Sequence, residues 1–88
     1  MVFDEFRIVS GTLFPDIAGR YQPIGDYNLR PSFEKEGGGW FIWWNGVNSW
    51  IISTVRGLGG VAYWTRTNPS EKGTYTPTPP ATGIATVT

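Results

Sequence analysis

The side chains with the greatest potential for chemistry in this 88-residue chain are its carboxylates. The chain has neither histidine nor cysteine, so nucleophilic or general-base catalysis would depend on carboxylates or lysine. Two carboxyl groups at a fixed separation are sufficient for glycoside hydrolysis. A cleft deep enough to activate a carboxylate is hard to build in so short a chain, so we expect solvated surface acids and no enzyme. These acids are Asp4, Glu5, Asp16, Asp26, Glu34, Glu36 and Glu71.

The spacing of the remaining residues gives little support to a metal or phosphate site. No Asp-x-Asp-x-Asp-Gly loop is present to hold a divalent cation. The missing cysteines exclude thiolate metal sites and disulfides. The run Arg56-Gly57-Leu58-Gly59-Gly60 has the glycines of a phosphate-binding loop, but it precedes a predicted strand and not a helix. We therefore expect a hairpin turn there, and no cofactor.

Charge and hydropathy narrow the classes of partner. Seven Lys and Arg balance seven Asp and Glu, whereas proteins that bind nucleic acid gain affinity by neutralising phosphates. The N-terminus carries Asp4 and Glu5 where a signal peptide needs a basic start, and no segment reaches the roughly 18 apolar residues of a membrane span. We expect no nucleic acid, membrane or export signal, and a complete short reading frame that starts at Met1.

The elements that carry these residues are predicted to be strands, because no stretch of the sequence has apolar residues at the spacing of a helix. We expect an all-β domain over residues 1–88, a small antiparallel sheet rolled into a partial barrel or two-layer sandwich, built from hairpins without significant helix. Gly37-Gly38-Gly39 and Asn45-Gly46 predict tight reversals. We expect an N-terminal strand over 2–10, a stretch that is mostly loop over 11–28, and a Trp-rich hairpin core over 19–66. A Thr/Pro segment over 74–88 follows. It consists of a polyproline-like crossing over 74–81 and a closing strand over 83–88.

The tryptophans are the main candidates for a binding surface. Alternation over 40–44 places Trp40, Ile42 and Trp44 on one face of a strand, with Phe41 and Trp43 on the other. Both faces are buried if the 11–28 segment and the C-terminal segment roof the second one. Otherwise some aromatic side chains form a contact patch, because aromatics and arginines anchor many interfaces. The predicted partner-binding residues are Trp43, Trp64, Tyr63, Arg30 and Arg66.

Gly-x-Tyr-x-Pro occurs twice, at 19–23 and at 73–77, and predicts two similar entry loops. Between these copies the chain carries Asn28-x-Arg30-Pro31-x-Phe33, Trp40-x-Ile42-Trp43-Trp44, Trp50-x-Ile52 and Tyr63-Trp64. In this order and spacing, the region from Gly19 to the end resembles a small Gly- and Trp-rich β-module that recurs in phage virion proteins and in some bacterial surface proteins. Leu29 stands where that module usually has glycine, and Phe33 where tyrosine is more common.

The resemblance implies a compact β fold and an architectural or adhesive role, without catalytic residues. We expect a phage structural protein, a capsid decoration protein or another virion-surface protein, which is made in the host cytoplasm and binds the major capsid or another virion protein. Homo-oligomers such as a trimer, or a symmetric array, are expected. The alternative is a carbohydrate-binding module that stacks sugars on exposed Trp and Tyr, with Asn45, Asn48 or Asp26 bonding sugar hydroxyls.

Overall fold

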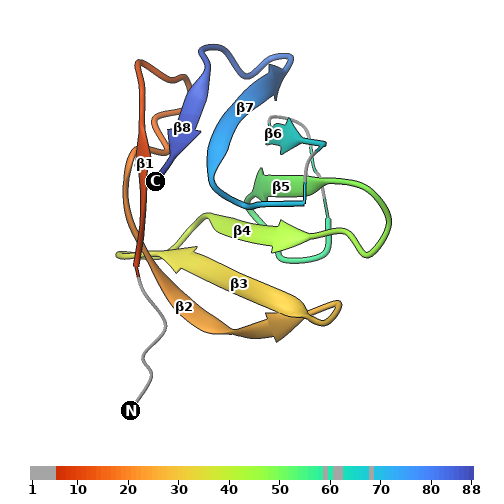
Figure 1. The fold of residues 1–88 in the computed structure, drawn as a ribbon. Coiled ribbons are helices and arrows are strands. Elements are labelled where there is room, and N and C mark those ends of the chain that lie inside the picture. Colours follow the sequence, from red (N-terminus) through yellow and green to blue (C-terminus); the bar gives the residue numbers. More distant parts are fainter. Residues whose placement is uncertain (1–5, 59, 61–62, 68) are drawn as a thin grey trace.

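The strands of this chain close into a β-barrel in the computed structural model, which describes residues 6–58, 60, 63–67 and 69–88 (Figure 1). Among these residues, eight strands and no helix are present. The strands are β1 (Arg7–Ser10), β2 (Gly19–Tyr27), β3 (Arg30–Lys35), β4 (Phe41–Trp44), β5 (Trp50–Ser53), β6 (Tyr63–Arg66), β7 (Gly73–Thr78) and β8 (Ala85–Val87). Each strand pairs antiparallel with the next, as the all-β prediction expected.

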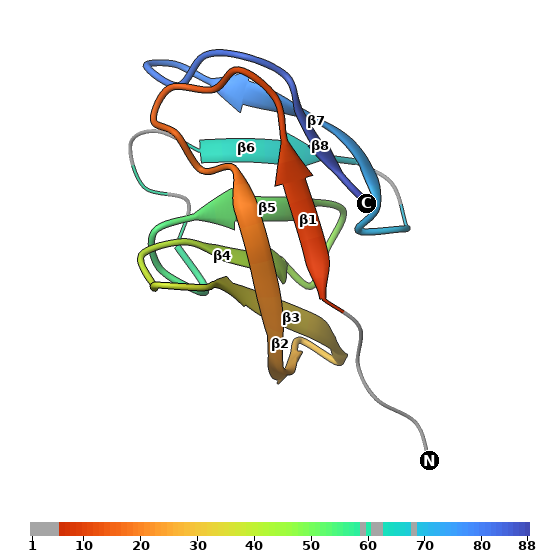
Figure 2. The same ribbon diagram turned by 90° about the vertical axis from the view of Figure 1, so that its left-hand side faces the viewer.

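The sheet closes because β8 returns to β1. Val9 pairs with Val87 and Ser10 with Thr86, which places the first and last strands side by side (Figures 1 and 2). The partial barrel or two-layer sandwich is therefore corrected to a closed barrel. The sequence signals of each hairpin are local, whereas this closing pair joins residues at opposite ends of the chain.

The barrel interior is built from side chains at alternate positions of neighbouring strands. Phe33 pairs with Ile42, Ile42 with Ile52, and Ile52 with Trp64, so four large side chains cross the interior in one row. All four are almost completely buried. The predicted alternation over 40–44 is confirmed, since Ile42 faces this core with Trp40 and Trp44 packed against it.

Strand β2 corrects the expectation that residues 11–28 are mostly loop. Pro23 and Gly25 interrupt the sequence pattern of a strand, but the pairing with β3 continues on both sides of them. The register shifts between Pro23 and Asp26, and such a bulge accommodates a proline that has no N–H to donate. The nine-residue β2 therefore holds two residue types that usually end strands.

The C-terminal segment is also more regular than its composition suggests. A polyproline-like crossing was expected over 74–81, but β7 is paired with β6 and with β8. Tyr75 is completely buried and fastens this strand to the core, together with Ala85 and Val87 of β8. The closing strand predicted over 83–88 is confirmed at Ala85–Val87.

Several predicted turns are confirmed. Gly37, Gly38 and Gly39 all have positive φ between β3 and β4, and Asn45-Gly46 begins the β4–β5 loop. The N-terminal strand predicted over 2–10 is observed at Arg7–Ser10, while residues 2–5 lie outside the described residues. The described part of the chain contains no helix with the length and apolar character that a membrane crossing needs.

Candidate functional site

Two of the five residues predicted to contact a partner, Trp43 and Trp64, have buried side chains. Trp64 lies inside the barrel and donates from Nε1 to the Gly83 carbonyl oxygen at 2.8 Å. Trp43 is on the outer side of β4, but it is only 4% exposed. The Tyr27 ring meets it edge-on at 5.9 Å, and its Nε1 donates to Ser53 Oγ at 2.9 Å. Neither indole is available to an outside molecule in this structure.

The second face of β4 is covered in part as expected, by Tyr27 from the 11–28 segment, and in part by a turn that was not expected there. The Ser53 hydroxyl that accepts from Trp43 also lies 2.6 Å from the Leu58 carbonyl oxygen. Val55 and Leu58 form a bridge around a tight turn, and the Arg56 guanidinium stacks over the Tyr27 ring at 5.1 Å. This turn and Tyr27 of β2 therefore roof Trp43, in place of the C-terminal segment. The turn expected over residues 56–60 is observed at Arg56 and Gly57, while Gly59 lies outside the described residues.

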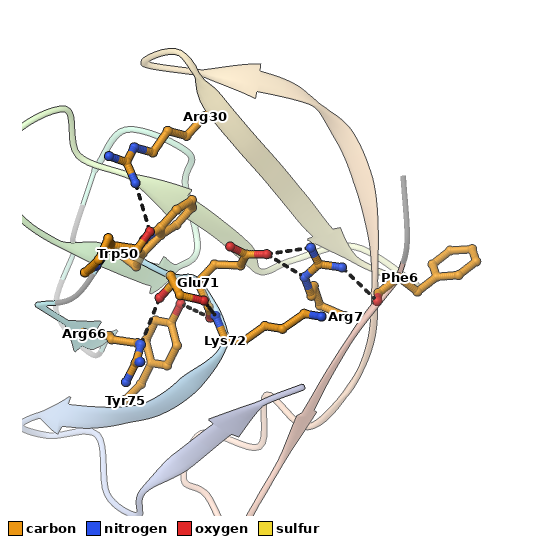
Figure 3. Close-up of polar contacts among 10 residues, drawn as sticks. Phe6, Arg7, Arg30, Trp50, Arg66, Glu71, Lys72 and Tyr75 are labelled. Atoms are coloured by element: carbon orange, nitrogen blue, oxygen red, sulfur yellow. Dashed lines mark hydrogen bonds and ion pairs between the residues drawn. The ribbon is translucent and has the colours of Figure 1, made fainter. Parts of the chain in front are cut away.

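The two predicted arginines hold the β6–β7 connection (Figure 3). Arg30 stacks over the Trp44 ring at 4.1 Å and donates to the Pro69 carbonyl oxygen at 2.9 Å. Arg66 donates from Nε to the Ser70 carbonyl oxygen at 2.9 Å. Both side chains are half-buried, so their hydrogen-bonding groups already serve the fold. Tyr63, the fifth predicted residue, is half-buried opposite Thr78.

An ion pair fastens the same connection across the barrel end. Arg7 of β1 donates from Nε to Glu71 Oε1 at 2.9 Å, and their side chains are 13% and 16% exposed (Figure 3). The Arg7 guanidinium also lies 4.8 Å from the centre of the Phe33 ring. The Arg7–Glu71 pair therefore joins β1 to the β6–β7 connection, which is distant from it in sequence.

The most exposed apolar side chains of the described residues lie at two turns that the sequence analysis did not identify as a binding surface. Leu29 of the β2–β3 turn is 96% exposed, and Val47 of the β4–β5 loop is 78% exposed. We call these two side chains the apolar tip. The search for aromatic anchors passed over both, although Leu29 in place of glycine after Asn28 was a signal that the turn is unusual.

The apolar tip is held on a well-defined backbone. Asn28 donates from Nδ2 to the Trp44 carbonyl oxygen at 2.9 Å, and it packs so closely on Gly46 that a Cβ there would lie 3.2 Å from Asn28 Cγ. Within the β4–β5 loop, Asn45 Oδ1 accepts from three consecutive backbone N–H groups, at 2.9, 2.9 and 3.1 Å. Leu29 follows Asn28 and Val47 follows Gly46, so this contact joins the β2–β3 turn to the β4–β5 loop, and Figure 1 shows both connections on the same side of the barrel.

A second apolar region lies at the other end of the barrel. Phe14 in the β1–β2 connection is 68% exposed and Ile84 in the β7–β8 connection is 51% exposed. Phe14 and Thr82 exchange backbone hydrogen bonds of 3.1 and 2.8 Å, which join the two connections. Because consecutive strands alternate in direction, these connections are at the opposite end from the turns that carry Leu29 and Val47.

The described residues contain no pocket and no group of three metal-ligating side chains. Glu36 pairs with Arg20 and Glu71 with Arg7, whereas Asp4 and Glu5 lie outside the described residues. No family model matches the chain, and neither a curated protein nor a solved structure matches it.

Proposed function

We propose that this chain is a non-enzymatic structural protein of a phage particle, which binds the assembled shell as a capsid decoration protein at the virion surface. The observation that carries the proposal is the exposure of large apolar side chains at both ends of a closed barrel. Exposed apolar side chains that gather in one region are typical of protein interfaces. The Gly- and Trp-rich motif order, with its likeness to virion modules, supports the same role.

Two apolar ends suit a protein that contacts more than one neighbour. Leu29 and Val47 are at one end, and Phe14 and Ile84 are at the other, with the barrel between them. A molecule with different surfaces at its two ends forms heterologous contacts, which close into rings or extend into arrays. Many copies on a symmetric shell of major capsid protein satisfy this geometry.

The carbohydrate-binding alternative receives less support from the tryptophans. Sugar stacking needs an open ring face, but Arg30 covers Trp44 at 4.1 Å and Trp50 lies 5.4 Å from the same ring. Trp40 meets Trp64 edge-on at 6.1 Å and packs against the core. Trp50, Trp64 and Trp43 are buried. The two half-buried indoles, Trp40 and Trp44, thus both contact other aromatic or cationic groups of the fold.

The proposal is tested by the size of the particle with which the chain co-sediments. A lysate of the cells that produce the chain is fractionated by density-gradient centrifugation, and the chain is detected in each fraction by mass spectrometry. We expect it in the fractions that contain assembled shells, in a constant ratio to the major shell protein. Sedimentation only as a free small chain contradicts the proposal, and saturable binding on an array of glycans would favour the alternative.

A further inference from the structure

Strand β2 has an open edge on the side of β1. Its pairing with β1 ends where Tyr21 lies opposite Arg7, whereas β2 continues to Tyr27 with β3 on its other side (Figure 1). Over residues 22–27, no described residue pairs with β2 on the β1 side. Unpaired backbone groups at such an edge are a template for another strand, and identical copies of a chain can join through them.

Pro23 faces this open edge. In an antiparallel strand the N–H and C=O of one residue point to the same neighbouring strand, and successive residues alternate. The Arg20 carbonyl oxygen accepts from the Glu36 N–H at 2.8 Å, on the side of β3. Tyr21 and Pro23 therefore point to the side of β1, because the register with β3 is unbroken from Tyr21 to Pro23. Since Pro23 has no N–H, the first position of the open edge gives an incoming strand a carbonyl but no donor.

Two further features lie on the same edge. Ile24 and Gly25 together lie opposite Ser32 of β3, which makes a β-bulge, and Gly25 has a φ of +98°. Ser32 Oγ donates to the Gly25 carbonyl oxygen at 2.7 Å and holds the bulge in place. Asp26 follows directly and is exposed. Prolines, bulges and charged side chains are the features by which exposed strand edges avoid pairing with other molecules.

We infer that the open edge of β2 is protected against pairing with a second copy of the chain, and that Pro23 is the main element of this protection. The proline, the bulge and the carboxylate coincide within residues 23–26, on a strand that is paired with β3 on its other side. The inference goes beyond the proposed function and does not depend on it. Protection of this kind matters most where many copies lie close together, because crowding favours pairing between identical edges.

Pro77 provides a comparison, because it has the matching position in the second Gly-x-Tyr-x-Pro copy. It lies in β7, whose pairing with β8 ends where Tyr75 lies opposite Ala85. Beyond that pair the chain's own β7–β8 connection is close by. Trp64, the partner of Pro77 in β6, donates from Nε1 to the Gly83 carbonyl oxygen of this connection at 2.8 Å. A second copy therefore has less access to this edge than to the edge at Pro23.

The test compares the self-association of the purified full chain with that of two variants. The edge variant combines Pro23→Val, which adds an N–H, with Asp26→Thr, which removes the charge, and valine and threonine both favour strands. The control variant combines Pro77→Val with Glu34→Thr, which removes a carboxylate from a residue paired on both sides. Thermal unfolding followed by Trp fluorescence verifies that the variants are folded. Sedimentation velocity over about a hundredfold range of concentration measures association.

We expect the edge variant to associate at least about tenfold more tightly than the parent chain, and the control variant to stay within about twofold of the parent. Pro23→Val alone should give an intermediate association, and it decides the question if the double variant does not fold. A folded edge variant that associates no more than the parent overturns the inference. Equal association of the control variant, or association that dilution does not reverse, also overturns it, because a general effect of the substitutions or unfolding would then be the cause. Binding to shells is not measured here, so the proposed function stands or fails separately.

Discussion

The hydroxyl of Tyr21 donates to the carbonyl oxygen of Ile17 at 2.8 Å, and the ring that carries it is completely buried. Tyr75 makes the same bond to the carbonyl oxygen of Glu71, again four residues earlier, at 2.7 Å. Each tyrosine is the third residue of its strand, and the glycine two positions before it has a positive φ, +142° in β2 and +135° in β7. The two copies of Gly-x-Tyr-x-Pro therefore build two equivalent strand entries.

This equivalence predicts that Tyr21→Phe and Tyr75→Phe destabilise the barrel by similar amounts. Each change removes a hydroxyl that bonds a backbone carbonyl while leaving the ring in the core, so we expect a loss of about 1–2 kcal/mol. Urea unfolding followed by Trp fluorescence measures it. Tyr63→Phe is the control, because its ring is half-buried at the barrel surface, and should cost about 0.5 kcal/mol or less. A change at Tyr63 as large as at Tyr21 would contradict the assigned role of the two bonds.

The same two tyrosines predict a loss of stability at alkaline pH. Burial raises the pKa of Tyr21, and nearby Asp16 raises it further. Burial and then Glu71 raise the pKa of Tyr75, against smaller opposing effects of Arg66 and Arg7. With folded pKa values above the unfolded value near 10, the unfolded chain releases protons first, so stability is retained below about pH 10 and falls above it.

For each buried tyrosine the decrease approaches about 1.4 kcal/mol per pH unit. Urea unfolding at intervals between pH 8 and about pH 11.5 measures the slope above pH 10. In Tyr21→Phe only Tyr75 remains to contribute, so that slope should be about half as steep. Equal stability at pH 8 and at about pH 11.5 would show that the two hydroxyls ionise as readily in the folded chain as in the unfolded chain.

Leu29 leads to a prediction in the opposite direction. Its φ of +70° is strained for leucine and relaxed for glycine, and its exposed side chain makes little contact with the fold. Leu29→Gly should therefore stabilise the isolated chain, by roughly 0.5–1 kcal/mol. Val47→Gly is the matched control, since it removes an exposed side chain at a residue without positive φ and should not stabilise. A destabilised Leu29→Gly variant would mean that the side chain contributes to the fold.

The local elements were predictable because their signals lie within a few residues. Gly37–Gly39 and Asn45-Gly46 marked reversals, and the alternation over 40–44 separated the two faces of β4 correctly. Strand β2 was missed because a bulge tolerates Pro23, and a bulge depends on the partner strand. The regular pairing of β7 was missed for a similar reason, since it depends on β6 and β8 on either side.

The site was less predictable than the fold. Aromatic residue type indicated Trp43 and Trp64 as contacts, yet residue type alone does not distinguish an indole in the core from one at an interface. The cover over Trp43 comes from Tyr27 and the 55–58 turn, which only the tertiary arrangement brings together. The turns that carry Leu29 and Val47 meet because Asn28 packs on Gly46, a contact without a sequence motif.

The two ion pairs of the described residues differ enough in burial to predict unequal effects on stability. Arg7 and Glu71 have side chains that are 13% and 16% exposed, whereas those of Arg20 and Glu36 are 53% and 38% exposed. Arg7→Met leaves a carboxylate with little access to water, and we expect a loss of about 2–3 kcal/mol. Arg20→Met removes a solvated pair and should cost about 0–1 kcal/mol.

Urea unfolding of both variants at neutral pH, at about 0.1 and 1 M sodium chloride, separates the two cases. The contribution of the exposed pair should decrease with salt, because solvent ions reach both of its partners. The cost of Arg7→Met should persist at high salt, since both side chains of this pair are largely buried and the Arg7 guanidinium lies over the Phe33 ring. Equal costs for the two substitutions would show that the Arg7–Glu71 pair is as solvated as the outer one and does not fasten the barrel end.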